Sequence, residues 1–332
     1  MNRPFGVFML PAYFSPMVYA VNLTLFDPVG VDYPDPNWTH KDFADICAKL
    51  TVHSTKTNRV GAGFGFHRSS INGEGWIFRA FGGDQMNSDG TKSTLSDPNC
   101  IAAAQWMYNT LFWPNICTGR NNAGATYGQY NFLTGGAAMA VIWDGIVLNL
   151  AAAVRSSMKW QIYPNPIFPA GRTTQGTEDF YGINAETKHP EHAWRLLKWL
   201  SYEKTWQSAL MQLGAVPPAR NDLWAEWVNI VQQVAPPLRN SGLQWLQDGA
   251  VKGYALPGEY YRYEDTSVRR VVGQWIQKLW NRQADVTEAF TQADRQANAI
   301  LTAAPAMLNN QAGIAKTFPT QGPPMAAVQP GL

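Results

Sequence analysis

The feature that most constrains the fold is an alternation of short strand-like runs with clearly delimited amphipathic helices. Thr39 and Asp42 have the capping-box spacing in front of an apolar helical stripe. Pro98 and Pro190 stand where two further helices begin, because a proline there gives up an N–H that has no helical partner anyway. Asp285 caps another helix near the end of the chain. Alternating strands and helices favour an α/β fold over an all-helical one.

The strand-like runs lie in the first half of the sequence and the helices dominate the second. The strand candidates are VFML, MVYAV, GAGFGF, AAMAVIW and WQIYPNP. In the second half, a helix from Pro190 to Leu200 is followed without a long break by one that ends near Leu213. Residues 303–332 are rich in Pro, Gly, Ala and Gln without periodicity, which predicts a disordered tail.

The charge and the aromatic content of the chain limit the classes of partner that it can bind. Lys and Arg total 26 against 24 for Asp and Glu, so the formal net charge of +2 argues against nucleic acid or a membrane surface as a partner. The chain carries 14 Trp and 13 Tyr, whose amphipathic rings suit a surface that is partly apolar and partly hydrogen-bonding. The alternative is that these rings form an aromatic-rich core.

Patterns for catalysis and for metal binding are weak. The sequence holds no G-x-S-x-G, G-x-x-x-x-G-K-[ST] or H-E-x-x-H motif. Cys47, Cys100 and Cys117 form no C-x-x-C pair, so we expect three thiols without disulfides, no metal and no cofactor. Two facing carboxylates would serve glycoside hydrolysis, and spacing in the sequence cannot test that arrangement.

Two apolar stretches must be tested as a signal peptide or a membrane-spanning helix. The first 21 residues carry one Arg and a short apolar run, but Pro4, Pro11 and Pro16 interrupt it and no A-x-A site follows. We therefore expect no signal peptide in this chain. The longest apolar stretch, Ala137 to Val154, has Asp144 in its middle and is better explained by a buried strand followed by a helix.

Several collinear segments carry a resemblance to a known family. LFDPVGVDYPDPNWTHKDFADICAKLT resembles the N-x-x-LF-x-x-x-G-V…P…WT-x-x-E/D-F…A-x-x-L segment of sugar-type solute-binding proteins of ABC importers. FLTGGAAMAV resembles their F-x-x-G-x-AAM segment, and GINAETKHPEHAWRLLKWLSYEKTWQSALMQLGAVPPARNDL is similar to their most recognisable region. The matches run in order from about Leu10 to Leu301, so the chain resembles the maltose-binding-protein-like family.

The resemblance implies a periplasmic-binding-protein-like (type II) bilobal α/β fold, present as one complete lobe plus a partial second lobe. Residues 1–181 and 223–302 would form the C-terminal-type lobe, and residues 182–222 would be helices of a mostly missing N-terminal-type lobe. If the sequence is a fragment, or if its start was assigned too late, most of the N-terminal-type lobe would be missing from it. Trp194, Leu197 and Leu210 on these helices should then be unusually exposed.

The resemblance also implies the function. A protein of this kind captures a sugar or oligosaccharide in an interlobe cleft, closes on it by a hinge, and delivers it unaltered to the transmembrane subunits of an ABC permease. The full-length protein would be periplasmic, or extracellular and tethered to the membrane. A glycoside-processing enzyme and a lectin-like carbohydrate-binding module remain alternatives, and polyol binders share the same motifs.

The candidate ligand-binding residues combine flat rings with polar partners. They are Tyr13, Ser15, Glu74, Trp76, Trp143, Asp144, Tyr181 and Tyr260. By the resemblance, Trp143 and Asp144 end a strand that reaches the cleft, where the ring would stack on a sugar and the carboxylate would accept its hydroxyls. The alternatives are a core Trp with a capping Asp here, a solvent-exposed hairpin turn for the NGEGW segment of Glu74 and Trp76, and core packing for the tyrosines.

Overall fold

The computed structural model describes residues 9–51, 64–65, 71–114, 116–118, 132–133, 137–143, 145, 147, 158–184, 186–214, 216–257 and 265–310. The strands are β1 (Met9–Pro16), β2 (Val18–Asn22), β3 (Phe64–Gly65), β4 (Cys117–Thr118), β5 (Met139–Ile142), β6 (Trp160–Tyr163), β7 (Ile167–Phe168), β8 (Gly171–Arg172), β9 (Thr174–Gly182) and β10 (Ala255–Pro257).

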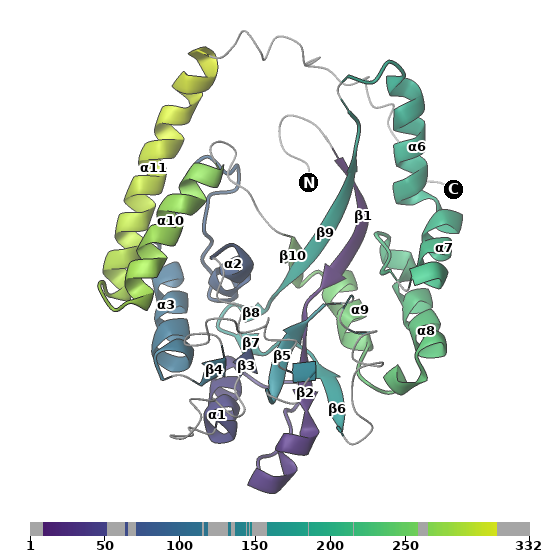
Figure 1. Cartoon of the computed structure of the whole chain (residues 1–332), viewed down its shortest axis with the longest axis horizontal. Coiled ribbons are helices and arrows are strands. Elements are labelled where there is room, and N and C mark those ends of the chain that lie inside the picture. Colours follow the sequence, from purple (N-terminus) through teal and green to yellow (C-terminus); the bar gives the residue numbers. More distant parts are fainter. Residues whose placement is uncertain are drawn as a thin grey trace.

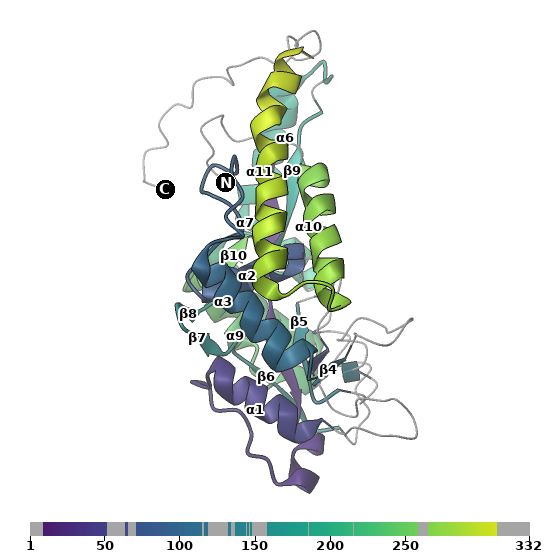
Figure 2. The same cartoon turned by 90° about the vertical axis from the view of Figure 1, so that its left-hand side faces the viewer.

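The helices surround these strands (Figures 1 and 2). The α-helices are α1 (His40–Leu50), α2 (Ile71–Ala80), α3 (Pro98–Trp106), α6 (Pro190–Tyr202), α7 (Lys204–Gly214), α8 (Trp224–Val234), α9 (Gln244–Val251), α10 (Asp265–Trp280) and α11 (Val286–Asn310). A π-helical segment, η3 (Met107–Phe112), continues α3, and the 3-10 turns are η1 (Leu23–Leu25), η2 (Asp27–Val29), η4 (Asn221–Leu223) and η5 (Pro236–Leu238).

A central mixed sheet separates two hydrophobic cores. Its strand order is β4-β3-β5-β2-β6, and β2 is buried along its whole length. Because side chains alternate along a strand, Tyr19 and Val21 enter one core while Val18 and Ala20 enter the other. The first core is completed by α1, α2, α3, α10 and α11, and the second by α7, α8 and α9. Figure 1 shows the two helical layers on opposite sides of the strands, so the predicted α/β class is confirmed.

A second sheet, of order β1-β9-β10, rises from the central one. Only Met17 separates β1 from β2, so the first strand of this sheet runs directly into the middle of the other. β1 and β9 pair antiparallel over nearly their whole length, and they form the long two-stranded ribbon at the centre of Figure 1. We call this pair the β1–β9 ribbon.

The helix boundaries follow the local signals in the sequence. Thr39 and Asp42 form the complete capping box of α1. The side chain of Asp97 caps α3 with Pro98 at its first position, and the Asp285 carboxylate accepts the Glu288 N–H at the start of α11 at 2.8 Å. The prediction of two consecutive helices that end near Leu213 is confirmed by α6 and α7.

Two predictions about helices are wrong. Disorder was expected over residues 303–332, but α11 continues to Asn310, because Leu301 and Ala304 extend its buried stripe, and residues 311–332 lie outside the described residues. Leu197 was expected to be exposed, but it is only 5% exposed, because α6 packs against β1 of the same chain. Trp194 and Leu210 are half-buried.

The unusual exposure predicted for α6 and α7 falls on other side chains. Leu196, Trp199 and Leu213 are exposed by 58%, 44% and 83%. Together with Tyr202, also exposed, and Trp206, whose ring lies 5.1 Å from that of Trp199, they form what we call the outer face of α6–α7. Among the described residues, no helix is long and apolar enough to cross a membrane.

Candidate ligand-binding site

The β1–β9 ribbon brings three of the candidate residues onto one surface. Tyr13 lies opposite Asp179, Ser15 opposite Thr177, and Leu10 opposite Tyr181. Directly opposed residues of an antiparallel pair share a face, as do alternate residues of one strand. Tyr13, Ser15 and Tyr181 therefore project from the same face of the ribbon, which also carries Thr177 and Asp179.

A β-bulge in β1 produces this arrangement. The pairing register shifts between Pro11 and Tyr13, so Ala12 is an extra residue on β1. A shift of one residue moves all following side chains to the opposite face. Without the bulge, Tyr13 would pair into the row of Glu178 and Phe180 rather than the row of Tyr181.

A buried glutamine holds the bulge in place. The Gln207 side-chain amide donates to the carbonyl of Ala12 at 3.4 Å and to that of Leu200 at 3.1 Å, and its oxygen accepts the Ala219 N–H at 2.9 Å. Gln207 is 1% exposed, so these bonds replace the water that its amide gives up on folding. One side chain thus fixes the bulge of β1 to α6, α7 and the following loop.

The shared face of the ribbon has the composition of a polar, aromatic surface. Tyr13, Thr177 and Tyr181 are half-buried, Asp179 is exposed and Ser15 is 1% exposed. Tyrosine rings offer an apolar face with a hydroxyl tip, while the Thr and Asp oxygens add hydrogen-bonding groups, and the buried Ser15 supports the row from within. We call these five residues the polar face of the ribbon.

Trp143 lies at the end of the central sheet that adjoins the ribbon. Ile142, the last residue of β5, pairs with Val18, the first residue of β2. Since β1 ends at Pro16, the chain leaves β5 at the junction between the two sheets. The Trp143 ring is half-buried against the second core, and its Nε1 would lie 3.0 Å from a Cβ placed on Gly145. Both a packing role and a partly open ring face are compatible with this position.

Trp76 requires a correction. Its ring is only 6% exposed within the first core and meets the Phe168 ring edge-on at 5.8 Å. A ring enclosed by side chains has no free face for a sugar, so we assign Trp76 to packing. The alternative of a hairpin turn is also wrong, because the NGEGW segment lies in α2. The Glu74 side chain, Asp144 and Tyr260 lie outside the described residues.

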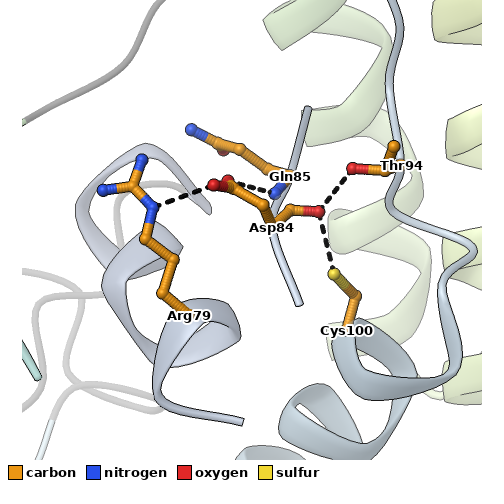
Figure 3. A network of polar contacts seen from close by, with 5 residues as sticks. All are labelled: Arg79, Asp84, Gln85, Thr94 and Cys100. Atoms are coloured by element: carbon orange, nitrogen blue, oxygen red, sulfur yellow. Dashed lines mark hydrogen bonds and ion pairs between the residues drawn. The ribbon is translucent and has the colours of Figure 1, made fainter. Parts of the chain in front are cut away.

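A polar network fixes α2, which lies beside β9. The Arg79 Nε donates to the Asp84 carboxylate at 3.1 Å, and the Asp84 backbone carbonyl accepts from the Thr94 hydroxyl and the Cys100 thiol (Figure 3). Burial raises the pKa of Cys100 to about 12, so this thiol stays protonated at neutral pH and acts as a donor. Cys47 and Cys100 are buried and form no disulfide in the described part of the chain.

Sequence reasoning missed Thr177 and Asp179. Their signal was the alternation of Thr177, Asp179 and Tyr181 along a strand, which becomes visible only when the TQGTEDFYG segment is recognised as β9. No group of three or more His, Cys, Asp or Glu side chains in the described ranges is arranged to hold a metal ion.

Comparison with solved structures identifies the fold. The chain is similar to an ABC substrate-binding protein from Listeria monocytogenes in complex with cycloalternan, with 17% identity, a TM-score of 0.73, and coverage of 90% of this chain and 74% of that one. It is similar to maltose-bound MalE3 of T. maritima, with 17% identity, a TM-score of 0.65, and coverage of 89% and 73%. It is also similar to the maltotriose-bound MalE domain of Bdellovibrio bacteriovorus, with 18% identity, a TM-score of 0.65, and coverage of 89% and 73%.

The fold is therefore that of the periplasmic solute-binding proteins. A family model described as bacterial extracellular solute-binding protein matches residues 6–230, and the chain belongs to that family. A comparison with curated proteins finds no match. The protein is a solute-binding protein, and the resemblance found in its sequence is confirmed.

Proposed function

We propose that this chain binds a carbohydrate at the junction of the β1–β9 ribbon and the central sheet, and that it presents this ligand to the transmembrane subunits of an ABC importer. The observation that carries the proposal is the polar face of the ribbon, which places Tyr13 and Tyr181 beside Thr177 and Asp179, with Ser15 buried in the same row. Trp143 follows Ile142, the last residue of β5, at the same junction.

The chemistry of this surface suits a saccharide. A sugar ring presents apolar C–H groups on its faces and hydroxyls at its rim, so it needs flat rings together with donors and acceptors in fixed positions. Tyr13 and Tyr181 supply rings and hydroxyls, and Asp179 supplies an acceptor for the ligand hydroxyls. The bulge at Ala12 and its bond from Gln207 keep these groups in one row.

The solved structures of similar fold support this ligand class. Their bound molecules are cycloalternan, maltose and maltotriose, which are all glucose-based carbohydrates. Membership of a family of solute-binding proteins supports transport of the ligand without chemical change. We therefore propose an extracellular or periplasmic binding role, with no turnover of the ligand.

The test is a pair of substitutions at adjacent positions of β9. Tyr181 lies on the polar face, and Phe180 lies on the opposite face of the same strand. Tyr181→Ala should weaken binding of the cognate sugar by about 1–3 kcal/mol, whereas Phe180→Ala should leave the affinity unchanged. Isothermal titration calorimetry against a panel of mono- and oligosaccharides measures both.

Two results would contradict the proposal. Equal losses for Tyr181→Ala and Phe180→Ala would show that the ribbon contributes only stability. Release of free sugar from a glycoside by the unmodified chain, abolished by Glu74→Gln or Asp144→Asn, would show an enzyme instead.

A further inference from the structure

The polar face of the ribbon carries a carboxylate flanked by two aromatic residues. Asp179 lies directly opposite Tyr13 in the pairing of β9 with β1, and Tyr181 stands two residues further along β9 on the same face. Directly opposed side chains of an antiparallel pair have Cβ atoms about 5 Å apart, and alternate residues of one strand are about 7 Å apart. Both rings are therefore within reach of a ligand group that contacts the Asp179 carboxylate.

The Asp179 carboxylate is exposed and available to a ligand. The part of the chain that the structure describes gives it neither a hydrogen bond nor an ion pair. By contrast, the carboxylates of Asp84, Asp248 and Asp294 elsewhere in the fold all accept from donors of this chain. Asp179 thus differs from these aspartates, because it makes no contribution to the hydrogen bonds that hold the described fold together.

The strands of the ribbon carry no positive charge. β1, β9 and β10 contain no Lys, Arg or His, and their charged residues are Glu178 and Asp179. Residues 9–22, which form β1 and β2, include no charged side chain at all. A surface lined by charge of one sign attracts ligands of the opposite sign and repels those of its own sign. The polar face of the ribbon therefore favours a cation over an anion.

The cations of the neighbouring helices do not neutralise this charge. α2, α6 and α9 contact β1 or β9. Arg79 of α2 and Lys252, which follows α9, are each paired with another aspartate. α6 has Leu197 on its buried side, and its exposed bases are His192, Arg195 and Lys198. In the described part of the chain, none of these cations pairs with Asp179.

A carboxylate beside two tyrosine rings suits a protonated amine. The carboxylate forms a charge-assisted hydrogen bond with an ammonium group, and the faces of aromatic rings attract the same cation. A sugar hydroxyl can donate to the carboxylate as well, but it brings no charge to the pair. A phosphate or a carboxylate on the ligand would be repelled by Asp179 and would meet no cation on the ribbon.

We propose that Asp179 makes the ribbon site select saccharides by their charge, and that its ligand is an amino sugar with a free, protonated amine. This inference rests on the proposed function, because it assigns the charge of the ligand at the same site. The expected order of affinity is an amine-bearing sugar first, a neutral sugar second and an anionic sugar last.

The experiment compares glucosamine, glucose and glucuronate, which share one ring and differ in charge. Isothermal titration calorimetry of the full chain is carried out at low ionic strength and about pH 6, where an exposed aspartate is ionised. Glucosamine should bind about two- to fivefold more tightly than glucose, and glucuronate more weakly by a similar factor, because an exposed ion pair contributes modestly. Asp179→Asn should bring the three affinities within about twofold of one another.

Two further measurements separate the charge of Asp179 from its other contributions. Salt at about 0.5 M should reduce the preference in the unmodified protein, because it screens exposed charges but not hydrogen bonds to a neutral sugar. Glu178→Gln is the matched control, since it removes the same charge from the neighbouring residue on the opposite face of β9, and it should keep the preference. The readout is a ratio of affinities within one preparation, so a loss of folded protein in either variant does not alter it.

Four results would contradict the proposal: equal affinities for glucosamine and glucose, a preference that survives Asp179→Asn, a preference that Glu178→Gln abolishes equally, or binding of ethanolamine as tight as that of glucosamine. Ethanolamine carries the amine without a sugar ring. Equal affinities for all three sugars, each weakened by Tyr181→Ala, would remove this inference and leave the proposed function standing. Absence of binding by any sugar would contradict both.

Discussion

Two glycines show how single residues fix the backbone of this fold. Gly242 precedes α9 with a φ of +95°, and a Cβ placed on it would lie 2.2 Å from the backbone oxygen of Ile162 in β6. Gly273 lies inside α10, with nothing within 4 Å of an added Cβ. The same chemical change, Gly to Ala, therefore meets opposite surroundings at the two positions.

We expect Gly242→Ala to lower the free energy of unfolding by more than about 2 kcal/mol. The cost of the unfavourable φ is added to the cost of the clash with the backbone oxygen of Ile162. Gly273→Ala should raise it by about 0.5–1 kcal/mol, because alanine loses less backbone entropy in a helix. Urea denaturation followed by circular dichroism measures both. Equal stability of the two variants would contradict the close approach of Gly242 to β6.

At the scale of residues, the sequence predicts side-chain chemistry better than side-chain position. Tyr13, Ser15 and Tyr181 were proposed separately, and only the pairing register shows that they share a face. That register depends on a bulge and on long-range pairing, neither of which has a local signal. Trp76 was misassigned for the same reason, because an amphipathic ring has the same sequence signature in a core and in a binding site.

At the scale of elements, Gln207 makes a connection that can be tested. Its amide bonds the carbonyls of Ala12 and Leu200 and the N–H of Ala219. Gln207→Ala leaves these buried groups without partners, so we expect a loss of about 1–3 kcal/mol in the free energy of unfolding. Gln212→Ala, an exposed position of the same helix, is the control and should change stability by less than about 0.5 kcal/mol.

The bulge gives this prediction a second readout. If Gln207 holds β1 in register, its removal should also weaken sugar binding at the polar face of the ribbon, while Gln212→Ala should not. A variant that loses stability but keeps full affinity would show that pairing with β9 alone sets the register.

Elements were predictable where their signals are local. Capping boxes and N-terminal prolines located α1, α3 and α6, and the apolar stripes located α10. β1 was cut short in the prediction, because Pro11 and Pro16 argue against a strand. The order β1-β9-β10 makes β1 an edge strand, where a missing N–H is tolerated.

At the scale of the whole molecule, the assignment of residues 182–222 to a second lobe remains a proposal. The chain covers about three quarters of the length of the similar solved structures. The outer face of α6–α7 leaves Leu196, Trp199 and Leu213 largely exposed. On its other side, α6 packs against β1 and β9. The helices α6 and α7 are therefore attached to the rest of the chain along one side only.

A segment packed along one side should open more easily than one buried on all sides. Trp224 and Trp227 of α8 are each 1% exposed, so α8 is the internal reference. Burying a large apolar side chain contributes about 1.5–3 kcal/mol, so leaving two or three of them exposed should lower the opening free energy of α6 and α7 by roughly 3 kcal/mol or more relative to α8. Native-state hydrogen exchange read by mass spectrometry, with low concentrations of urea, measures both segments in one experiment.

Gln207→Ala should widen the difference in opening free energy between α6–α7 and α8, because it loosens the attachment of α7 to β1. If α6 and α7 exchange only through global unfolding, with the free energy of α8, then residues 182–222 form one cooperative unit with the central sheet, and the assignment to a separate lobe is wrong.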